Sequence, residues 1–154
     1  MGEIMDTIWW TQTLLALGMM VAGSVWDMRE RRIPLWLPGI VGAAALCLTL
    51  WQMARGETGW LALTVSLLPG AGLLLLSWGT RERIGRGDGL VVLAAGLCLG
   101  AAECVAALAA GLLLAAAGAA FLLVLKKANR QTRLPFLPFL TVGTGAVLWL
   151  ANVR

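Results

Sequence analysis

The sequence predicts an all-α, polytopic membrane protein with six transmembrane helices and both termini outside. Of its 154 residues, 60% are hydrophobic and 13% are charged, against about 45–50% and about 25% in soluble globular proteins. Apolar runs long enough to cross a bilayer follow one another along the chain, and basic residues gather in alternate loops. We therefore expect a single six-helix membrane domain over residues 1–154.

The first three expected spans are 8–26, 36–54 and 60–78, and charged residues separate these apolar runs. An apolar stretch then runs from 89 to 125, which as one helix would be about 55 Å long, nearly twice the thickness of the hydrocarbon core. We divide it at residues 100–103, around Gly100 and Glu103, into two spans. The sixth expected span is 138–151.

The basic residues predict the orientation of these spans. Ten of the 12 Lys and Arg residues lie in the loops after the first, third and fifth spans; only Arg55 and Arg154 lie on the other side. The positive-inside rule places those three loops in the cytoplasm. The net charge of +4 is then explained by topology and by anionic lipid headgroups, so we expect the bilayer, and no nucleic acid, as a partner.

Several classes of chemistry are excluded by composition. The chain has no His and no Tyr, which rules out Ser-His-Asp and Cys-His catalysis and any His-ligated metal. Its three cysteines stand singly in apolar stretches without a C-x-x-C pair, so we interpret them as packing residues and expect no cofactor and no metal. Glu3 and Asp6 occupy the place of a basic region, so the N-terminus is not predicted to be a cleavable signal.

Acid–base chemistry must therefore come from carboxylates, and two of the eight adjoin span ends. Asp27 follows the first span and Asp88 precedes the fourth. The alternation of spans places both on the cytoplasmic side, although they are far apart in sequence. Taken alone, Asp88 is better explained as a helix N-cap, with Gly85 and Gly87 forming a tight turn before it.

Asp27 is harder to explain structurally, because the dipole at a helix C-terminus disfavours an anion by about 0.3–1 kcal/mol. An ion pair with Arg31 is one compensation, worth about 0.2–0.5 kcal/mol. The small residues Gly23 and Ser24, one turn earlier, leave that face open to another helix or to water. Because the fourth span is only about 20 Å long, Asp88 is drawn into the membrane, where two adjacent carboxylates would share a proton and activate water.

Three segments resemble motifs of the type IV prepilin peptidases, which are intramembrane aspartyl peptidases. Residues 27–34, from Asp27 to Ile33-Pro34, are similar to the D-x5-I-P motif of that family. Residues 85–88 are similar to its G-x-G-D motif, and residues 134–140 to the proline and phenylalanine signature at its last span.

The resemblance implies that Asp27 and Asp88 are the catalytic pair, with the mouth of the site shaped by Gly85, Gly87, Ile33, Pro34, Pro135 and Phe136. It implies removal of the basic leader from prepilins or pseudopilins, substrates of type IV pili and protein secretion, at the cytoplasmic face of the plasma membrane. Long members carry paired C-x-x-C motifs and methylate the new N-terminus. Those motifs are lacking here, so we expect peptidase activity without N-methyltransferase activity.

The chain departs from the family pattern at two positions. Leu35 stands where many relatives have Asn, and Leu90 where they have Lys. The alternatives are a small ion- or proton-coupled transporter that uses the carboxylate pair, a structural assembly subunit or inactive paralogue, and a Ser/Lys peptidase that uses Ser24.

Overall fold

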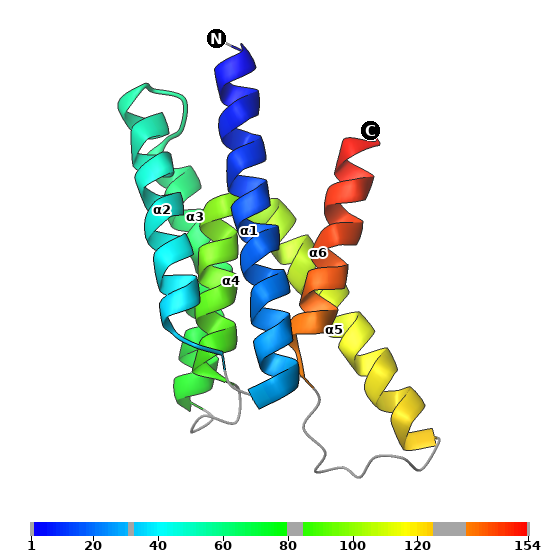
Figure 1. Cartoon of the computed structure of the whole chain (residues 1–154). Helices are drawn as coiled ribbons and strands as arrows, with labels where there is room; N and C mark the ends of the chain where they lie inside the picture. Colours follow the sequence, from blue (N-terminus) through cyan, green and yellow to red (C-terminus); the bar gives the residue numbers. More distant parts are fainter. Residues whose placement is uncertain (1, 31–32, 80–84, 125–134, 154) are drawn as a thin grey trace.

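A computed structural model describes residues 2–30, 33–79, 85–124 and 135–153, and throughout these ranges the regular structure is helical, without strands (Figure 1). This confirms the predicted all-α class. The helices are α1 (Gly2–Glu30), α2 (Trp36–Ala54), α3 (Trp60–Gly79), α4 (Arg86–Leu99), α5 (Ala101–Val124) and α6 (Leu137–Asn152).

The expected break in the long apolar stretch is confirmed at Gly100. This residue separates α4 from α5 and has a φ of +88°, a left-handed conformation that glycine adopts without steric cost. Its amide donates to Gly96 as α4 ends, and its carbonyl accepts the first bond of α5 from Cys104. One apolar run of sequence therefore becomes two helices.

Four helices are long and apolar enough to cross a membrane: α1 from Asp6 onward, α2, α3 and α5. The apolar part of α6, Leu137–Ala151, is shorter, and α4 has only 14 residues. At 1.5 Å per residue α4 is about 21 Å long, against a hydrocarbon core of about 30 Å. The chain thus has the helices of a membrane protein, while the crossing of all six stays a prediction.

The most enclosed helix of the bundle is α4, which packs against α1, α2, α3 and α5. From Gly89 to Leu99 nearly every residue is buried, whereas α2 and α3 bury only narrow stripes. Close approach depends on small residues, because Gly70 of α3 abuts Leu93 and Gly96 abuts the backbone of Ser66. The packing of α4 against its neighbours therefore fixes the position of Asp88, which lies in the first turn of this helix.

The last helix, α6, packs between α1 and α5. Its Gly143 lies so close to α5 that a Cβ atom there would be 2.7 Å from the amide nitrogen of Gly111 and 3.1 Å from the carbonyl oxygen of Ala107. Towards its C-terminal end, α5 slants away from this contact (Figure 1). The contact fixes α6 along α1, which sets the position of the first turn of α6.

Some of the residues that support the predicted orientation lie within the described ranges. The beginning of α1 and the end of α6 lie at the same end of the bundle (Figure 1). At that end the Arg55 guanidinium stacks 5.1 Å from the ring centre of Trp51; at the other, the rings of Trp26 and Trp36 meet edge to face at 6.0 Å. The basic residues 31–32, 81–83 and 126–133, including the Arg31 partner expected for Asp27, lie outside the described residues, so the orientation stays a prediction.

The α5–α6 contact predicts a difference between two glycines of the same helix. Replacing Gly143 with Ala forces a methyl group into the backbone of α5, so we expect Gly143→Ala to lower the free energy of unfolding by about 1–3 kcal/mol. Gly145 has open space around it, so Gly145→Ala should leave stability unchanged or raise it by up to about 1 kcal/mol. Unfolding in mixed micelles by SDS titration measures both, and equal effects would contradict the contact.

Candidate active site

Asp27 lies in the last turn of α1 and is only 8% exposed. The backbone N–H of Leu137 donates a hydrogen bond to its Oδ2 over 3.3 Å. Leu137 is the first residue of α6, where the amide has no partner within its own helix and the helix dipole is positive. The carboxylate thus caps a neighbouring helix, which offsets the unfavourable position at the end of its own.

The open face expected beside Gly23 and Ser24 is occupied by α6. The side chain of Leu137 lies against Gly23, where a Cβ atom would collide with it. One turn farther along α6, the hydroxyl of Thr141 lies 2.7 Å from that of Ser24. Of the two possibilities left open by the sequence, a helix therefore fills this face.

Asp88 lies in the first turn of α4, but it is not the N-cap of that helix. The helix begins at Arg86, and its N-cap is Gly85, whose carbonyl accepts the amide hydrogen of Asp88 over 3.1 Å. The expectation that Asp88 caps α4 is therefore wrong. Its carboxylate folds back over the start of the helix and lies beside Gly85: a Cβ atom on Gly85 would be 3.2 Å from Oδ2 of Asp88.

The two aspartates, on α1 and α4, interact electrostatically. Asp88 stands in the first turn of a helix that is not among the four candidate membrane spans. Burial raises the pKa of Asp88 from its ordinary 3.8 to about 6, and the negative charge of Asp27 contributes to the rise. The fold thus brings together two carboxylates from distant segments, one of which keeps its proton closer to neutral pH than an ordinary Asp.

The glycines before Asp88 serve a different purpose from the expected turn. Gly85 has a φ of −62° and Gly87 is already helical, so the tight turn is wrong. Gly87 instead permits a close approach, because a Cβ atom there would lie 2.9 Å from Cβ of Ile33. The segment that follows Asp27 is therefore packed directly on the segment that carries Asp88.

The prolines and Phe136 lie where helices begin. The carbonyl of Pro34 accepts the amide hydrogen of Leu37 at the start of α2, over 3.1 Å. Pro135 and Phe136 immediately precede α6; Phe136 is its N-cap residue and packs against the buried core. Pro34 thus contributes to the start of α2, and Pro135 and Phe136 lead into the first turn of α6, whose Leu137 amide lies beside Asp27.

Leu137 and Thr141 were missed by the sequence reasoning. A backbone amide carries no signature in a side-chain pattern, although Pro138 within the first turn is typical of a helix start. Thr141 looks like any small polar residue of an apolar span. Their roles depend on the packing of α6 against α1.

The departures from the family pattern do not touch a carboxylate. Leu35 is the N-cap residue of α2 and makes no side-chain cap, a position where Asn would be favourable. Leu90 is partly buried in α4. Cys98 and Cys104 are buried and Cys47 is exposed. Within the described ranges, no three His, Cys, Asp or Glu residues gather as metal ligands.

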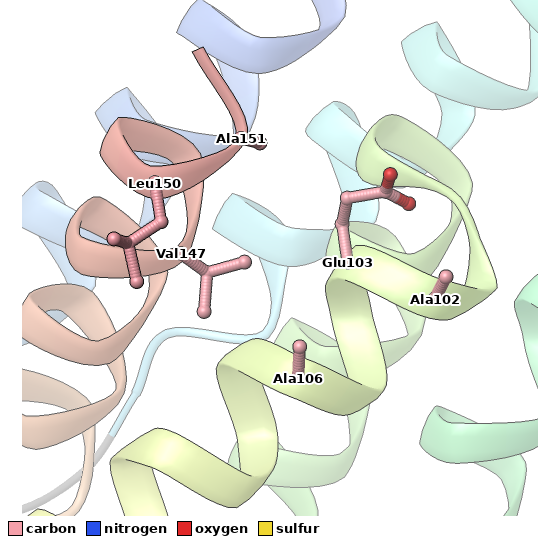
Figure 2. Close-up of a pocket in the computed structure, with 6 residues that line it drawn as sticks. All are labelled: Ala102, Glu103, Ala106, Val147, Leu150 and Ala151. Atoms are coloured by element: carbon pink, nitrogen blue, oxygen red, sulfur yellow. The ribbon is translucent and has the colours of Figure 1, made fainter. Parts of the chain in front are cut away.

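Two cavities lie at the opposite end of the bundle from the aspartates. The larger, about 340 Å³, lies between the start of α5 and the end of α6 (Figure 2). Figure 2 shows its single carboxylate, that of Glu103, turned away from Val147 and Leu150. The other, about 190 Å³, is lined by residues from the ends of α1, α2, α3 and α4, among them Gln12 and Thr49. Neither cavity is lined by Asp27 or Asp88.

The electrostatic contact predicts that the titration of Asp88 depends on Asp27. In Asp27→Asn the neighbouring charge is removed, so the pKa of Asp88 should fall below about 6 but stay above 3.8, because burial persists. Infrared spectroscopy of the protonated carboxyl band, with Asp88→Asn to assign it, measures this shift. An unchanged titration would show that the two carboxylates do not interact.

Comparison with known proteins agrees with this arrangement. Residues 14–123, more than two thirds of the chain, match the type IV leader peptidase family, and the match contains both aspartates, Ile33-Pro34 and residues 85–88. No curated protein and no solved structure gives a significant match. The matched length and the convergence of the motif segments identify the chain as a member of the type IV leader peptidase family.

Proposed function

We propose that this protein is an aspartic-type endopeptidase that removes the basic leader from prepilins or pseudopilins. Membership of a leader peptidase family indicates a peptidase. The observation that carries the aspartic assignment is the electrostatic interaction of Asp27 with Asp88 at one end of the bundle. The packing of Ile33 on Gly87 also brings the two segments that carry these aspartates together. Such a pair can share one proton and activate water.

The surroundings of the two carboxylates suggest different roles for them. Oδ2 of Asp27 accepts the Leu137 amide hydrogen, as an ionised carboxylate does, and the raised pKa of Asp88 makes it the holder of the proton. In the proposed reaction Asp27 takes a proton from water while Asp88 donates a hydrogen bond to the scissile carbonyl. Water adds to that carbonyl, and the proton taken up by Asp27 passes to the leaving amine as the peptide bond breaks, so no covalent enzyme intermediate forms.

We further propose that all six helices cross the plasma membrane, with the aspartate end towards the cytoplasm. The basic loops and the positive-inside rule support this orientation. The bilayer then aligns the apolar helix of the substrate with the enzyme, so that its basic leader meets the carboxylates.

The remaining parts of the proposal concern reactions that the chain does not perform. Its three cysteines lie on three different helices and form no C-x-x-C motif, so we propose leader removal without N-methyl transfer. Asp27 is the one charged residue that is buried within the described ranges. A transporter would need further charged groups that continue a path through the bundle from this pair.

The catalytic assignment predicts the loss of peptide cleavage in two variants. Purified wild type should cut a prepilin-like peptide that carries a basic leader and an apolar segment, and Asp27→Asn and Asp88→Asn should each lower kcat by at least about 1,000-fold. Either variant cutting at the wild-type rate would overturn the dyad. Mass spectrometry of the products locates the cleaved bond and detects any N-methyl group.

The matched control for these variants is Glu103→Gln, which neutralises a carboxylate at the opposite end of the bundle. Glu103→Gln should keep wild-type kcat and KM. Activity that survives a chelator would agree with the dyad, whereas its loss would point to a metal-dependent mechanism.

The raised pKa of Asp88 predicts that cleavage declines towards alkaline pH. The protonated form of Asp88 persists up to about pH 6 and is lost as the pH rises through that value, so kcat/KM should fall, by close to tenfold per pH unit well above it. Rates measured between about pH 5 and about pH 8, with helicity followed at each pH, test this. A kcat/KM that stays level or rises across the range would contradict a protonated Asp88.

A further inference from the structure

Polar contacts between α1 and α6 do not end at Asp27. About one helical turn from the hydrogen bond between the Leu137 amide and Asp27, the hydroxyls of Ser24 and Thr141 lie 2.7 Å apart. Thr141 Oγ1 also lies 3.2 Å from the carbonyl oxygen of Met20, one turn back along α1. In an otherwise apolar interface these contacts hold the two helices in a single register.

Thr141 is the centre of this network. Its Oγ1 is 2.9 Å from the carbonyl oxygen of Leu137 and 3.2 Å from that of Met20, and both of these oxygens are acceptors only. The hydroxyl of Thr141 has one hydrogen, which these two carbonyl oxygens share, while the Ser24 hydroxyl donates to Thr141 Oγ1. Thr141 is thereby tied to α1 by the bond from Ser24 and by its share of the bond to Met20.

The same residue of α6 connects the network to the candidate active site. Leu137 contacts Thr141 through its carbonyl oxygen and Asp27 through its amide nitrogen. The hydrogen bond from the Leu137 amide to Asp27 is 3.3 Å long, slightly longer than is usual for an N–H···O hydrogen bond. A shift of α6 by a few tenths of an ångström would therefore break it. The spacing agrees with this coupling: Ser24 precedes Asp27 by one turn of α1, and Thr141 follows Leu137 by one turn of α6.

We propose that Thr141, acting with Ser24, is a positioning residue for Asp27: it fixes the first turn of α6 so that the Leu137 amide holds one carboxylate oxygen and leaves the other for water. This role rests on the proposed peptidase function. Thr141 touches no reacting atom in this scheme, and it acts on Asp27 only through Leu137.

The charged groups near Asp27 bear on any test of this role. Among the described residues, Asp88 on α4 interacts with Asp27. The sequences of α2 and α6 contain no charged residue. Arg29 and Glu30, on the same helix as Asp27, are exposed; Arg86, at the start of α4, is exposed and has an interaction partner.

The test replaces Thr141 with Val, which keeps the shape of the side chain and removes the hydroxyl. We expect kcat to fall about tenfold with KM changed less than about twofold, because substrate binding is untouched and only the orientation of Asp27 is lost. Thr141→Ser keeps the hydroxyl and should restore most of kcat.

The matched control is Thr144→Val on the same face of α6. Thr144 is fully buried and its hydroxyl contacts Leu140 and the sulfur of Met20, so this variant also removes a hydroxyl from the α1–α6 interface, but away from Leu137 and Asp27. It should lose similar stability with kcat unchanged. Equal kinetic effects in the two variants, or none in Thr141→Val, would overturn the positioning role.

A substrate-free measurement separates this inference from the proposed function. The carboxylate stretching band of Asp27, assigned by difference with Asp27→Asn, should shift in Thr141→Val and in Ser24→Ala, and stay in place in Thr144→Val. If wild type does not cleave prepilin-like peptides but the band shifts as expected, the peptidase function is wrong and the positioning of Asp27 stands. If wild type cleaves but the band does not move, the positioning role is wrong. Ser24→Ala provides the answer where Thr141→Val does not fold.

Discussion

Two carboxylates at one end of an apolar helix bundle impose a cost that the surrounding helices must offset. Asp27 is almost wholly buried and interacts with Asp88, so ionising both would place like charges together in a medium of low dielectric. Two features offset this cost: the hydrogen bond from the Leu137 amide to Asp27, and the proton that Asp88 retains to about pH 6. The two identical side chains thus have unequal surroundings: Asp27 accepts a backbone hydrogen bond, and Asp88 has a raised pKa.

This arrangement depends on close contacts between backbones. Ile33 reaches α4 because Gly87 has no side chain, and α6 reaches α5 because Gly143 has none. The first contact brings the D-x5-I-P and G-x-G-D segments together, and the second sets where α6 begins beside α1. The family match ends at residue 123, before α6, yet α6 supplies the donor that Asp27 needs. The matched motifs and the helix that supports them thus come from different parts of the chain.

Much of the candidate site was predictable because its chemistry is carried by rare residue types. In a chain without His, the acids adjoining the ends of apolar runs were the groups left for acid–base work, and their order matched a family pattern. The local structure predicted around Asp88 was less accurate. The turn at Gly85 and Gly87 and the N-cap at Asp88 were wrong, because the helix begins at Arg86 and its first residues were judged from local rules alone. The close approach of Ile33 that explains Gly87 is a long-range contact.

The sequence by itself determined the helical class, the break at Gly100 and the place of Asp27 and Asp88 at helix ends, because hydrophobic run length, glycine and charge act locally and leave a direct pattern in the chain. The tertiary structure alone decided that Asp27 caps α6, that Asp88 interacts with Asp27, and that Thr141 joins Leu137 to α1. Each of these depends on which helices pack together and at what register, and hydrogen bonds and charges act over a few ångströms of space whatever the distance along the sequence.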